Sequence, residues 1–208
     1  MAYLQWLFWC LATTNQPDTP LFFNCSNTRF GYNSRSIKDG VSISERPPEV
    51  EDRAIPGHWE GDLITGSANT HIATLVERQS RFTMLVKVAG KDTRTVVDAL
   101  TQHVRGLPGI LKQSLTWDRG SELADHKRFT IATDMQVYFC DPQSPWQRGT
   151  NENTNRLLRQ YFPKKTNLAV HSQEYLDEIA LRLNQRPRKT LDFMTPADKL
   201  YECVALTS

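Results

Sequence analysis

The hydrophobic pattern of the central region opens with three short runs rich in β-branched and aromatic residues. They cover residues 59–64, 71–77 and 82–88, and polar turns at 66–69 and 78–81 separate them. Runs of this kind joined by short turns are typical of an antiparallel meander. The sequence therefore predicts three consecutive antiparallel strands.

After Gly90 the apolar residues recur at helical spacing, and they are Val96, Val97, Leu100, Val104 and Leu107. Asp92 or Thr93 suits the N-cap of that helix. Further along, the pattern alternates between the two element types, with strand 114–117, helix 121–133, strand 136–140, helix 152–161 and helix 171–185. This order predicts an α/β fold with a mixed five-stranded sheet, three antiparallel strands followed by two parallel ones, flanked by helices.

The first 50 residues show no sustained period, so we assign 1–50 to an extension and linker and 51–208 to the folded core. Residues 13–50 are rich in Asn, Ser, Thr, Pro and Gly, as poorly ordered segments are. The apolar run at 3–12 has no basic residues before it and is too short to span a bilayer. We expect this run to pack as a short amphipathic segment or to stay loose, with an export signal as the alternative.

Composition narrows the class of protein. A chain of 208 residues with 39% hydrophobic and 23% charged residues suits one globular domain with extensions. The net charge is only +2, so any nucleic-acid role depends on local basic clusters. Cys10, Cys25, Cys140 and Cys203 lack metal-binding spacing, which favours reduced thiols in a cytoplasmic protein, with no zinc site and no membrane association.

Three acidic residues stand at element positions that suit chemistry. Asp62 lies in the first predicted strand, Asp118 ends the fourth, and Glu152 opens a helix after an interval of 33 residues. If the fourth strand pairs parallel to the first, the two aspartates project toward the same sheet edge and Glu152 approaches from above. Carboxylates prefer Mg²⁺ or Mn²⁺, and two such ions promote in-line phosphoryl transfer. The pattern predicts a metal-dependent site that cuts and joins DNA.

Each acid also has a structural interpretation when taken alone. Asp118 suits the start of a turn, and Glu152 suits a helix N-terminus. Glu60 shares strand parity with Asp62, and Glu122 follows Asp118 closely, so both are alternative ligands. We interpret His58 as structural or close to DNA, because metal activation of the nucleophile needs no histidine base.

The segment from residue 148 onward is rich in basic residues. We expect one face of the helix at 152–161 to follow the phosphate backbone of DNA, with a solvated surface as the alternative. Trp146 either stacks on a flipped base or acts as a hydrophobic clasp that seats the helix. The predicted DNA-binding residues are Trp146, Arg148, Arg156, Arg159, Lys164 and Lys165.

Seven blocks of residues carry a resemblance to a known family. The stretch from about Ile37 to Pro196 resembles the catalytic core of IS-thirty family insertion-sequence transposases, within the retroviral-integrase superfamily of DDE enzymes. The blocks are Gly57–Asp62, Thr74–Arg78, Leu115–Gly120, Tyr138–Pro142, Ser144–Gly149, Asn151–Asn153 and Arg156–Lys164.

The resemblance implies a ribonuclease-H-like fold, Asp62, Asp118 and Glu152 as the acid triad, and Mg²⁺ or Mn²⁺ as cofactor. It also implies a transposase that cleaves DNA at element ends and transfers the freed strand. Its partners would be the terminal inverted repeats, target DNA and further copies of itself on DNA, so we expect association with the nucleoid.

The start of the chain differs from the family pattern. Such transposases begin with a helix-turn-helix region, and residues 1–36 show no pattern of that kind. We therefore expect a truncated or frame-disrupted copy. The alternatives are an idle fragment that binds DNA or full-length transposase and modulates transposition, and a related integrase or nuclease that acts on another nucleic acid.

Overall fold

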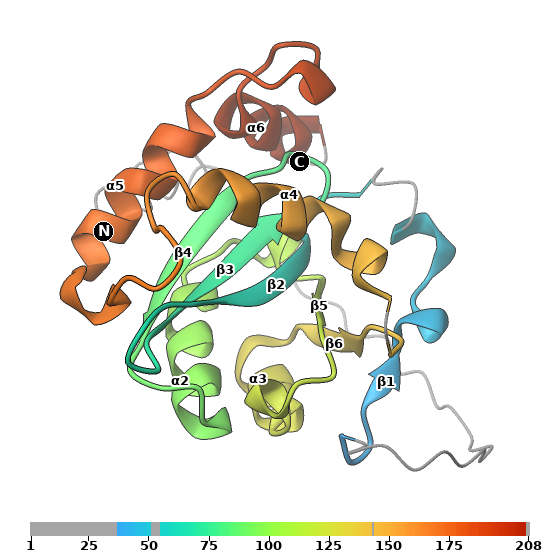
Figure 1. The fold of residues 1–208 in the computed structure, drawn as a ribbon. Helices are drawn as coiled ribbons and strands as arrows, with labels where there is room; N and C mark the ends of the chain where they lie inside the picture. The colour runs from blue at the N-terminus through green and yellow to red at the C-terminus, as the bar shows by residue number, and fades with distance from the viewer. Residues whose placement is uncertain (1–36, 51–54, 143, 207–208) are drawn as a thin grey trace.

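The structure is a computed structural model that describes residues 37–50, 55–142 and 144–206, so the apolar run at 3–12 lies outside it. Its strands form one six-stranded sheet in the order β1-β6-β5-β2-β3-β4 (Figure 1). The strands are β1 Val41–Ser42, β2 His58–Thr65, β3 His71–Glu77, β4 Thr83–Val88, β5 Ser114–Trp117 and β6 Gln136–Phe139.

The strand pairing confirms the predicted mixed sheet. β2, β3 and β4 pair antiparallel in sequence order, whereas β5 pairs parallel to both β2 and β6. The expected number of five strands was wrong by one, because Val41–Ser42 adds β1 beside β6. Two residues give no period in a sequence, and their pairing depends on a strand about a hundred residues away.

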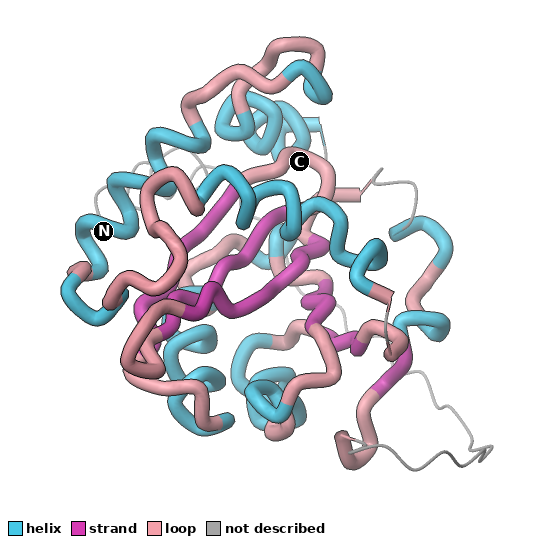
Figure 2. Tube along the Cα trace, viewed as in Figure 1, coloured by secondary structure: helices cyan, strands magenta, loops and turns pink. Residues whose placement is uncertain are grey.

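Helices cover both faces of this sheet, as Figure 2 shows in cyan and magenta. The α-helices are α2 Thr93–Val104, α3 His126–Thr133, α4 Gly149–Leu158, α5 Gln173–Asn184 and α6 Pro196–Leu206. Short 3₁₀ turns lie between them, at η1 Ile43–Glu45, η2 Pro48–Val50, η3 Gly109–Leu111, η4 Ser121–Leu123, η5 Pro145–Arg148, η6 Leu168–Val170 and η7 Lys189–Leu191.

Two helix predictions need correction. The helix expected at 121–133 is divided, because η4 precedes α3 and the α-helix begins only at His126. α6 was not predicted, although its start carries a signal. The Thr195 hydroxyl accepts a hydrogen bond from the backbone N–H of Asp198 at 3.1 Å, and Pro196 occupies the first helical position. Both features favour a helix N-terminus.

Each face of the sheet has its own hydrophobic core. α2, α3 and α6 pack on one side, where Val97, Phe129 and Leu200 join Trp59 of the sheet. α4 and α5 pack on the other side, where Leu158 and Leu176 contact a separate set of strand residues that includes Ile64, Ile72 and Leu85. The candidate acids lie where the α4 layer meets β2 and β5.

The close approach of β2 and β5 depends on Gly61. A Cβ atom at this position would overlap the ring of Trp117, which is buried at the end of β5. We expect Gly61→Ala to lower the free energy of unfolding by about 1–3 kcal/mol, because the indole cannot move without disturbing the core. Urea denaturation measures this change.

Gly109→Ala is the matched control for that substitution. No heavy atom lies within 4 Å of a Cβ built at Gly109. Its free energy of unfolding should therefore stay within about 0.5 kcal/mol of the parent chain. Equal denaturation midpoints for the two variants would contradict the role assigned to Gly61.

Candidate active site

Asp62 lies on β2, and Asp118 directly follows the neighbouring parallel strand β5. β2 and β5 pair from His58 with Ser114 to Glu60 with Thr116, and the same offset carries Asp62 to Asp118. The side chains are 28% and 43% exposed, so solvent reaches both carboxylates. The parallel pairing expected for the first and fourth strands is confirmed, and it brings these two acids to one edge.

The guanidinium of Arg148 links the two acids. Its Nη1 lies 3.1 Å from Asp62 Oδ1, and its Nη2 lies 3.8 Å from Asp118 Oδ2. Nη1 also donates to the carbonyl oxygen of Gly61 at 3.1 Å. Arg148 therefore faces the two acids with only 12% of its side chain exposed, in place of the open surface expected of a phosphate contact.

The charges around Arg148 keep its guanidinium protonated. Burial disfavours the charged form, but Asp62 and Asp118 outweigh it and raise the pKa of Arg148. The nearby thiol of Cys140 is buried, which raises its pKa to about 11 and leaves it protonated. Cys140 and Cys203 are both buried, whereas Cys10 and Cys25 fall outside the described residues.

Asn151 fastens the start of α4 to the sheet. Its backbone N–H donates to Glu60 Oε2 at 3.0 Å, and its side-chain amide donates to the Glu60 carbonyl at 2.8 Å. The Thr74 hydroxyl in turn donates to Asn151 Oδ1 at 3.1 Å. All three residues are at most 1% exposed. Buried polar groups satisfied in this way fix both the position and the rotation of a helix.

α4 then follows β2 along its length. Asn155 donates to Asp62 Oδ2 at 3.0 Å, one helical turn after Asn151, and Arg159 donates to the carbonyl of Thr65 at 3.3 Å. Four helical residues rise about 6 Å, close to the length of two strand residues. Contacts can therefore repeat along the pair, and Asn155 helps to orient Asp62.

Three further acids stand on the elements around these two, and they differ in burial and contacts. Glu152 stands in the first turn of α4, next to Asn151, and its side chain is exposed. Glu60, an alternative ligand by sequence, is instead buried, with Oε1 3.6 Å from the guanidinium of Arg78. Glu122 lies against the turn after Asp118, because a side chain on Gly120 would collide with both carboxylates. Glu152 and Glu122 are thus the two candidates for a third acid.

Trp146 lies in η5 with 72% of its surface exposed. It borders a pocket of about 360 Å³ whose lining includes Glu60, Arg78 and Gly149. An exposed indole does not act as a hydrophobic clasp for α4. Stacking on an unpaired base stays a prediction.

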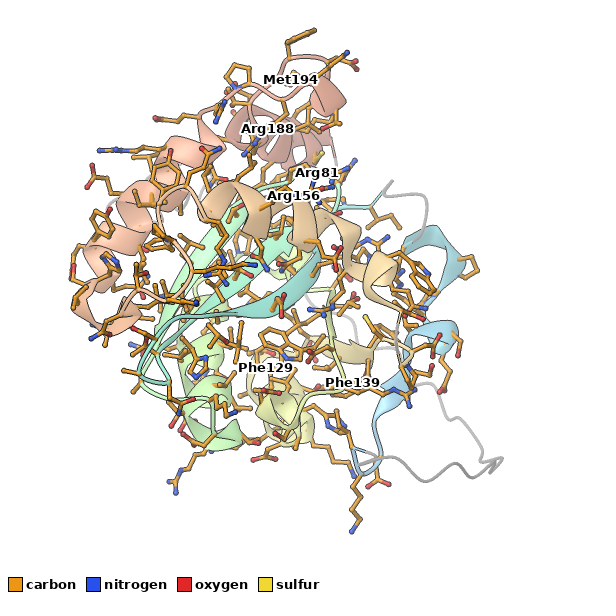
Figure 3. The ribbon with its side chains drawn as sticks, viewed as in Figure 1. Arg81, Phe129, Phe139, Arg156, Arg188 and Met194 are labelled. Carbon is orange, nitrogen blue, oxygen red and sulfur yellow. The ribbon has the colours of Figure 1, made fainter. Side chains whose placement is uncertain are left out.

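The other basic candidates differ in what they contact. Arg156, Lys164 and Lys165 have exposed side chains, whereas the guanidinium of Arg159 is half-buried and bonded to backbone carbonyls. Figure 3 shows Arg156 on α4, with Arg81 and Arg188 labelled toward the same upper part of the view. Arg156 and the two lysines are therefore the residues available for phosphate contacts.

The sequence left the roles of Arg148, Asn151 and Asn155 unrecognised. A run of poor helix formers, Gly149 to Asn153, did carry a signal, because such a helix needs tertiary contacts to form. Asparagines four residues apart fit one helix face and can supply such contacts.

The donor set suits a divalent metal ion. Asp62 and Asp118 present hard oxygen atoms that already share one cationic group, the Arg148 guanidinium. Across the described residues, no three His, Cys, Asp or Glu side chains lie close enough to bind a metal ion together. The fit therefore rests on the two aspartates, with the third acid still to be assigned.

Comparison with known proteins indicates the class of domain that this chain contains. The integrase core domain family matches residues 52–145, the segment that contains both aspartates. The six-stranded mixed sheet with helices on both faces is consistent with the ribonuclease-H-like fold of this class.

Over most of its length the chain is similar to transposases of the IS30 family of insertion sequences. It is 58% identical over 172 residues to the transposase InsI for insertion sequence element IS30A of Escherichia coli K12, covering 83% of this chain and 45% of the relative. It is 53% identical over 170 residues to the transposase for IS1086 of Cupriavidus metallidurans, covering 81% and 50%. It is also 33% identical over 169 residues to the transposase for IS4351 of Bacteroides fragilis, covering 81% and 52%.

The chain spans about half the length of the curated relatives it matches. In the part of the chain that the structure describes, no helix is long and apolar enough to cross a membrane.

Proposed function

We propose that this chain is the catalytic core of a DDE transposase that cleaves DNA at insertion-sequence ends and transfers the freed strand to target DNA. The observation that carries the proposal is the pair Asp62, on β2, and Asp118, directly after the parallel strand β5, both facing the guanidinium of Arg148. The similarity to IS30 family transposases supports it.

Asp62 and Asp118 would hold Mg²⁺ or Mn²⁺, with Glu152 as the third ligand. Bound there, the metal supplies Lewis acidity and promotes ionisation of the attacking water or hydroxyl. The protein positions the carboxylates that would bind the metal. Asn155 holds the Asp62 carboxylate at 3.0 Å, and Asn151 fixes the helix that carries Glu152.

The reaction consists of two phosphoryl transfers. Water first attacks the phosphorus at the element end, so a new P–O bond forms and the P–O3′ bond breaks to give a free 3′-hydroxyl. That hydroxyl then attacks a target phosphorus, loses its proton and joins the two DNAs, while the 3′-oxygen of the target strand leaves and takes up a proton. No oxidant or reductant is needed.

Phosphate contacts belong to the exposed basic residues beyond Glu152. We expect the Lys164→Ala and Lys165→Ala double variant to bind duplex DNA more weakly and with less salt dependence. Loss of two phosphate contacts should reduce the slope of log K against log salt by about 1–2. Fluorescence anisotropy over a series of salt concentrations measures the slope.

Lys127→Ala is the control for this charge change. Lys127 is exposed on α3, across the sheet from α4, where it pairs with Asp39 at 2.6 Å. Its removal should leave the salt slope unchanged. Equal slopes for the double variant and the parent chain would place the DNA on another surface.

The proposed function is tested by a strand-transfer assay with the full chain, pre-cut duplexes from the ends of its own element, and Mg²⁺ or Mn²⁺. Joined products that need the metal support a transposase. Metal-dependent cutting of RNA or unrelated DNA without joining would favour a nuclease. DNA binding without chemistry would favour the idle fragment.

Two further parts of the proposal concern partners and place. Two element ends have to be cut and joined together, which calls for more than one catalytic copy, so we include a homo-oligomer on DNA. The terminal inverted repeats and the target DNA are the proposed partners, and the nucleoid is the proposed location.

A further inference from the structure

Arg148 is placed to compete with the metal ion for the same two carboxylates. It is the last residue of η5 and immediately precedes α4, and its side chain turns inward to Asp62 and Asp118. A divalent ion bound directly to both acids would bring a second positive charge within a few ångströms of the guanidinium. Like charges in a partly buried site repel each other strongly.

The guanidinium of Arg148 does not use all of its hydrogen-bond donors on the two carboxylates. The 3.8 Å separation from Asp118 exceeds hydrogen-bond distance, and Nη1 divides its contacts between Asp62 and the Gly61 carbonyl. Its Nε is buried and has no hydrogen-bond partner among the described residues. A charged group with unsatisfied donors is held less firmly than a fully paired one.

We propose that Arg148 is a built-in counter-cation, which keeps Asp62 and Asp118 together without metal and withdraws from them when a divalent ion binds. The inference rests on the proposed function and adds a positioning residue to it. Mg²⁺ carries twice the charge and binds oxygen at about 2.1 Å, so its attraction to a carboxylate exceeds that of the guanidinium about threefold before hydration.

Withdrawal of the Arg148 side chain would also connect metal binding to Glu152, the proposed third ligand, because both residues lie at the start of α4. Arg148 is the residue before α4, and Glu152 stands four residues later in the first turn of that helix. The backbone of Arg148 is not helical, with φ −122° and ψ 36°, so it can change without unwinding α4. The guanidinium therefore keeps the acids from repelling each other in the free protein and leaves the site when the ion replaces it.

The test measures Mn²⁺ affinity in the absence of DNA, by isothermal titration calorimetry on the full chain. Arg148→Gln should bind Mn²⁺ about 3- to 10-fold more tightly than the parent, because the competing cation is gone. Arg148→Lys keeps the charge but loses the planar fork, so its affinity should fall between the two.

Arg119→Gln separates competition from a general loss of positive charge. Arg119 adjoins Asp118, but its guanidinium contacts the Cys140 carbonyl at 2.9 Å and Asp141 at 3.8 Å. Its Mn²⁺ affinity should change less than twofold. If Arg148→Gln binds Mn²⁺ no more tightly than Arg119→Gln, or more weakly than the parent, the inference is overturned.

Thermal melting gives a second readout that does not depend on catalysis. Without metal, Arg148→Gln should melt at a lower temperature than the parent, since the two acids lose their shared cation. Saturating Mn²⁺ should raise its melting temperature by more than it raises that of the parent. Equal Mn²⁺-induced shifts in both proteins would count against the inference.

Asp62→Asn distinguishes this inference from the proposed function. If Asp62→Asn abolishes Mn²⁺ binding while Arg148→Gln behaves like Arg119→Gln, only the role of Arg148 is wrong. If Mn²⁺ binding survives Asp62→Asn, or the parent binds no Mn²⁺, the metal site itself is wrong and the inference falls with it.

Discussion

Asp62→Asn should reduce strand transfer by at least about a thousandfold. An amide supplies a weaker metal ligand than a carboxylate, and loss of metal geometry removes chemistry that occurs only in the transition state. The same loss is expected for Asp118→Asn, since both carboxylates face the same guanidinium, that of Arg148. Joined products from pre-cut element ends are quantified against the parent chain.

Glu178→Gln is the control for these variants, because Glu178 is exposed on α5 and pairs with Arg182 at 2.6 Å. It should retain full activity, and thermal melting should show that all variants fold. Asp62→Asn with parental activity would remove the acid from the mechanism.

The third acid is decided by comparing Glu152→Gln with Glu122→Gln. Glu152 should be the essential one, because Asn151 fixes the helix turn that carries it. Glu122→Gln is expected to keep activity within about tenfold of the parent, since its side chain packs against the turn after Asp118. The reverse result would transfer the ligand role to Glu122.

Asn151→Ala should destabilise the fold and disable the site together. The substitution leaves the buried backbone carbonyls of Glu60 and Thr74 without their side-chain donor, and it removes the Oδ1 atom that accepts from the Thr74 hydroxyl. We expect the free energy of unfolding to fall by about 2–4 kcal/mol. Urea denaturation measures stability, and strand transfer at low temperature measures activity in the folded fraction.

Asn153→Ala offers the matched control on the same helix, because Asn153 is exposed two residues further along. It should change stability by less than about 0.5 kcal/mol. If Asn151→Ala is equally mild, α4 must be held mainly by its apolar contacts, such as those of Leu158.

Much of the fold follows from periodicity and sequence order. Alternating runs identified β2, β3 and β4, and helical spacing identified α2, because both patterns are local. The parity of Glu60 and Asp62 was also predictable, and both side chains face α4. β1 was missed because its pairing with β6 is non-local, and α6 because the cap formed by Thr195 was overlooked.

The sequence predicted where the two aspartates of the site lie better than it predicted which side chains contact them. A strand-end aspartate next to another on a parallel strand is a matter of topology, so Asp62 and Asp118 could be paired from the sequence. The inward turn of Arg148 could not, because a basic residue before a polar helix is most often exposed. Its burial depends on the backbone path through η5, where the side chain of Gln147 bonds to Asp141.

Because α4 is fixed against β2, the position of Glu152 relative to Asp118 depends on the rotation of the helix as well as on the number of residues between the two acids. Asn151 meets Glu60 and Asn155 meets Asp62, so the helix has one permitted rotation against β2. Extra residues in the turn around Asp141 and Pro142 would lengthen the path and leave that rotation intact. A single residue inserted between Asn151 and Glu152 would swing the acid by about 100° around the helix axis. The length of the loop before α4 can therefore change in evolution or by engineering, whereas the number of residues between Asn151 and Glu152 cannot.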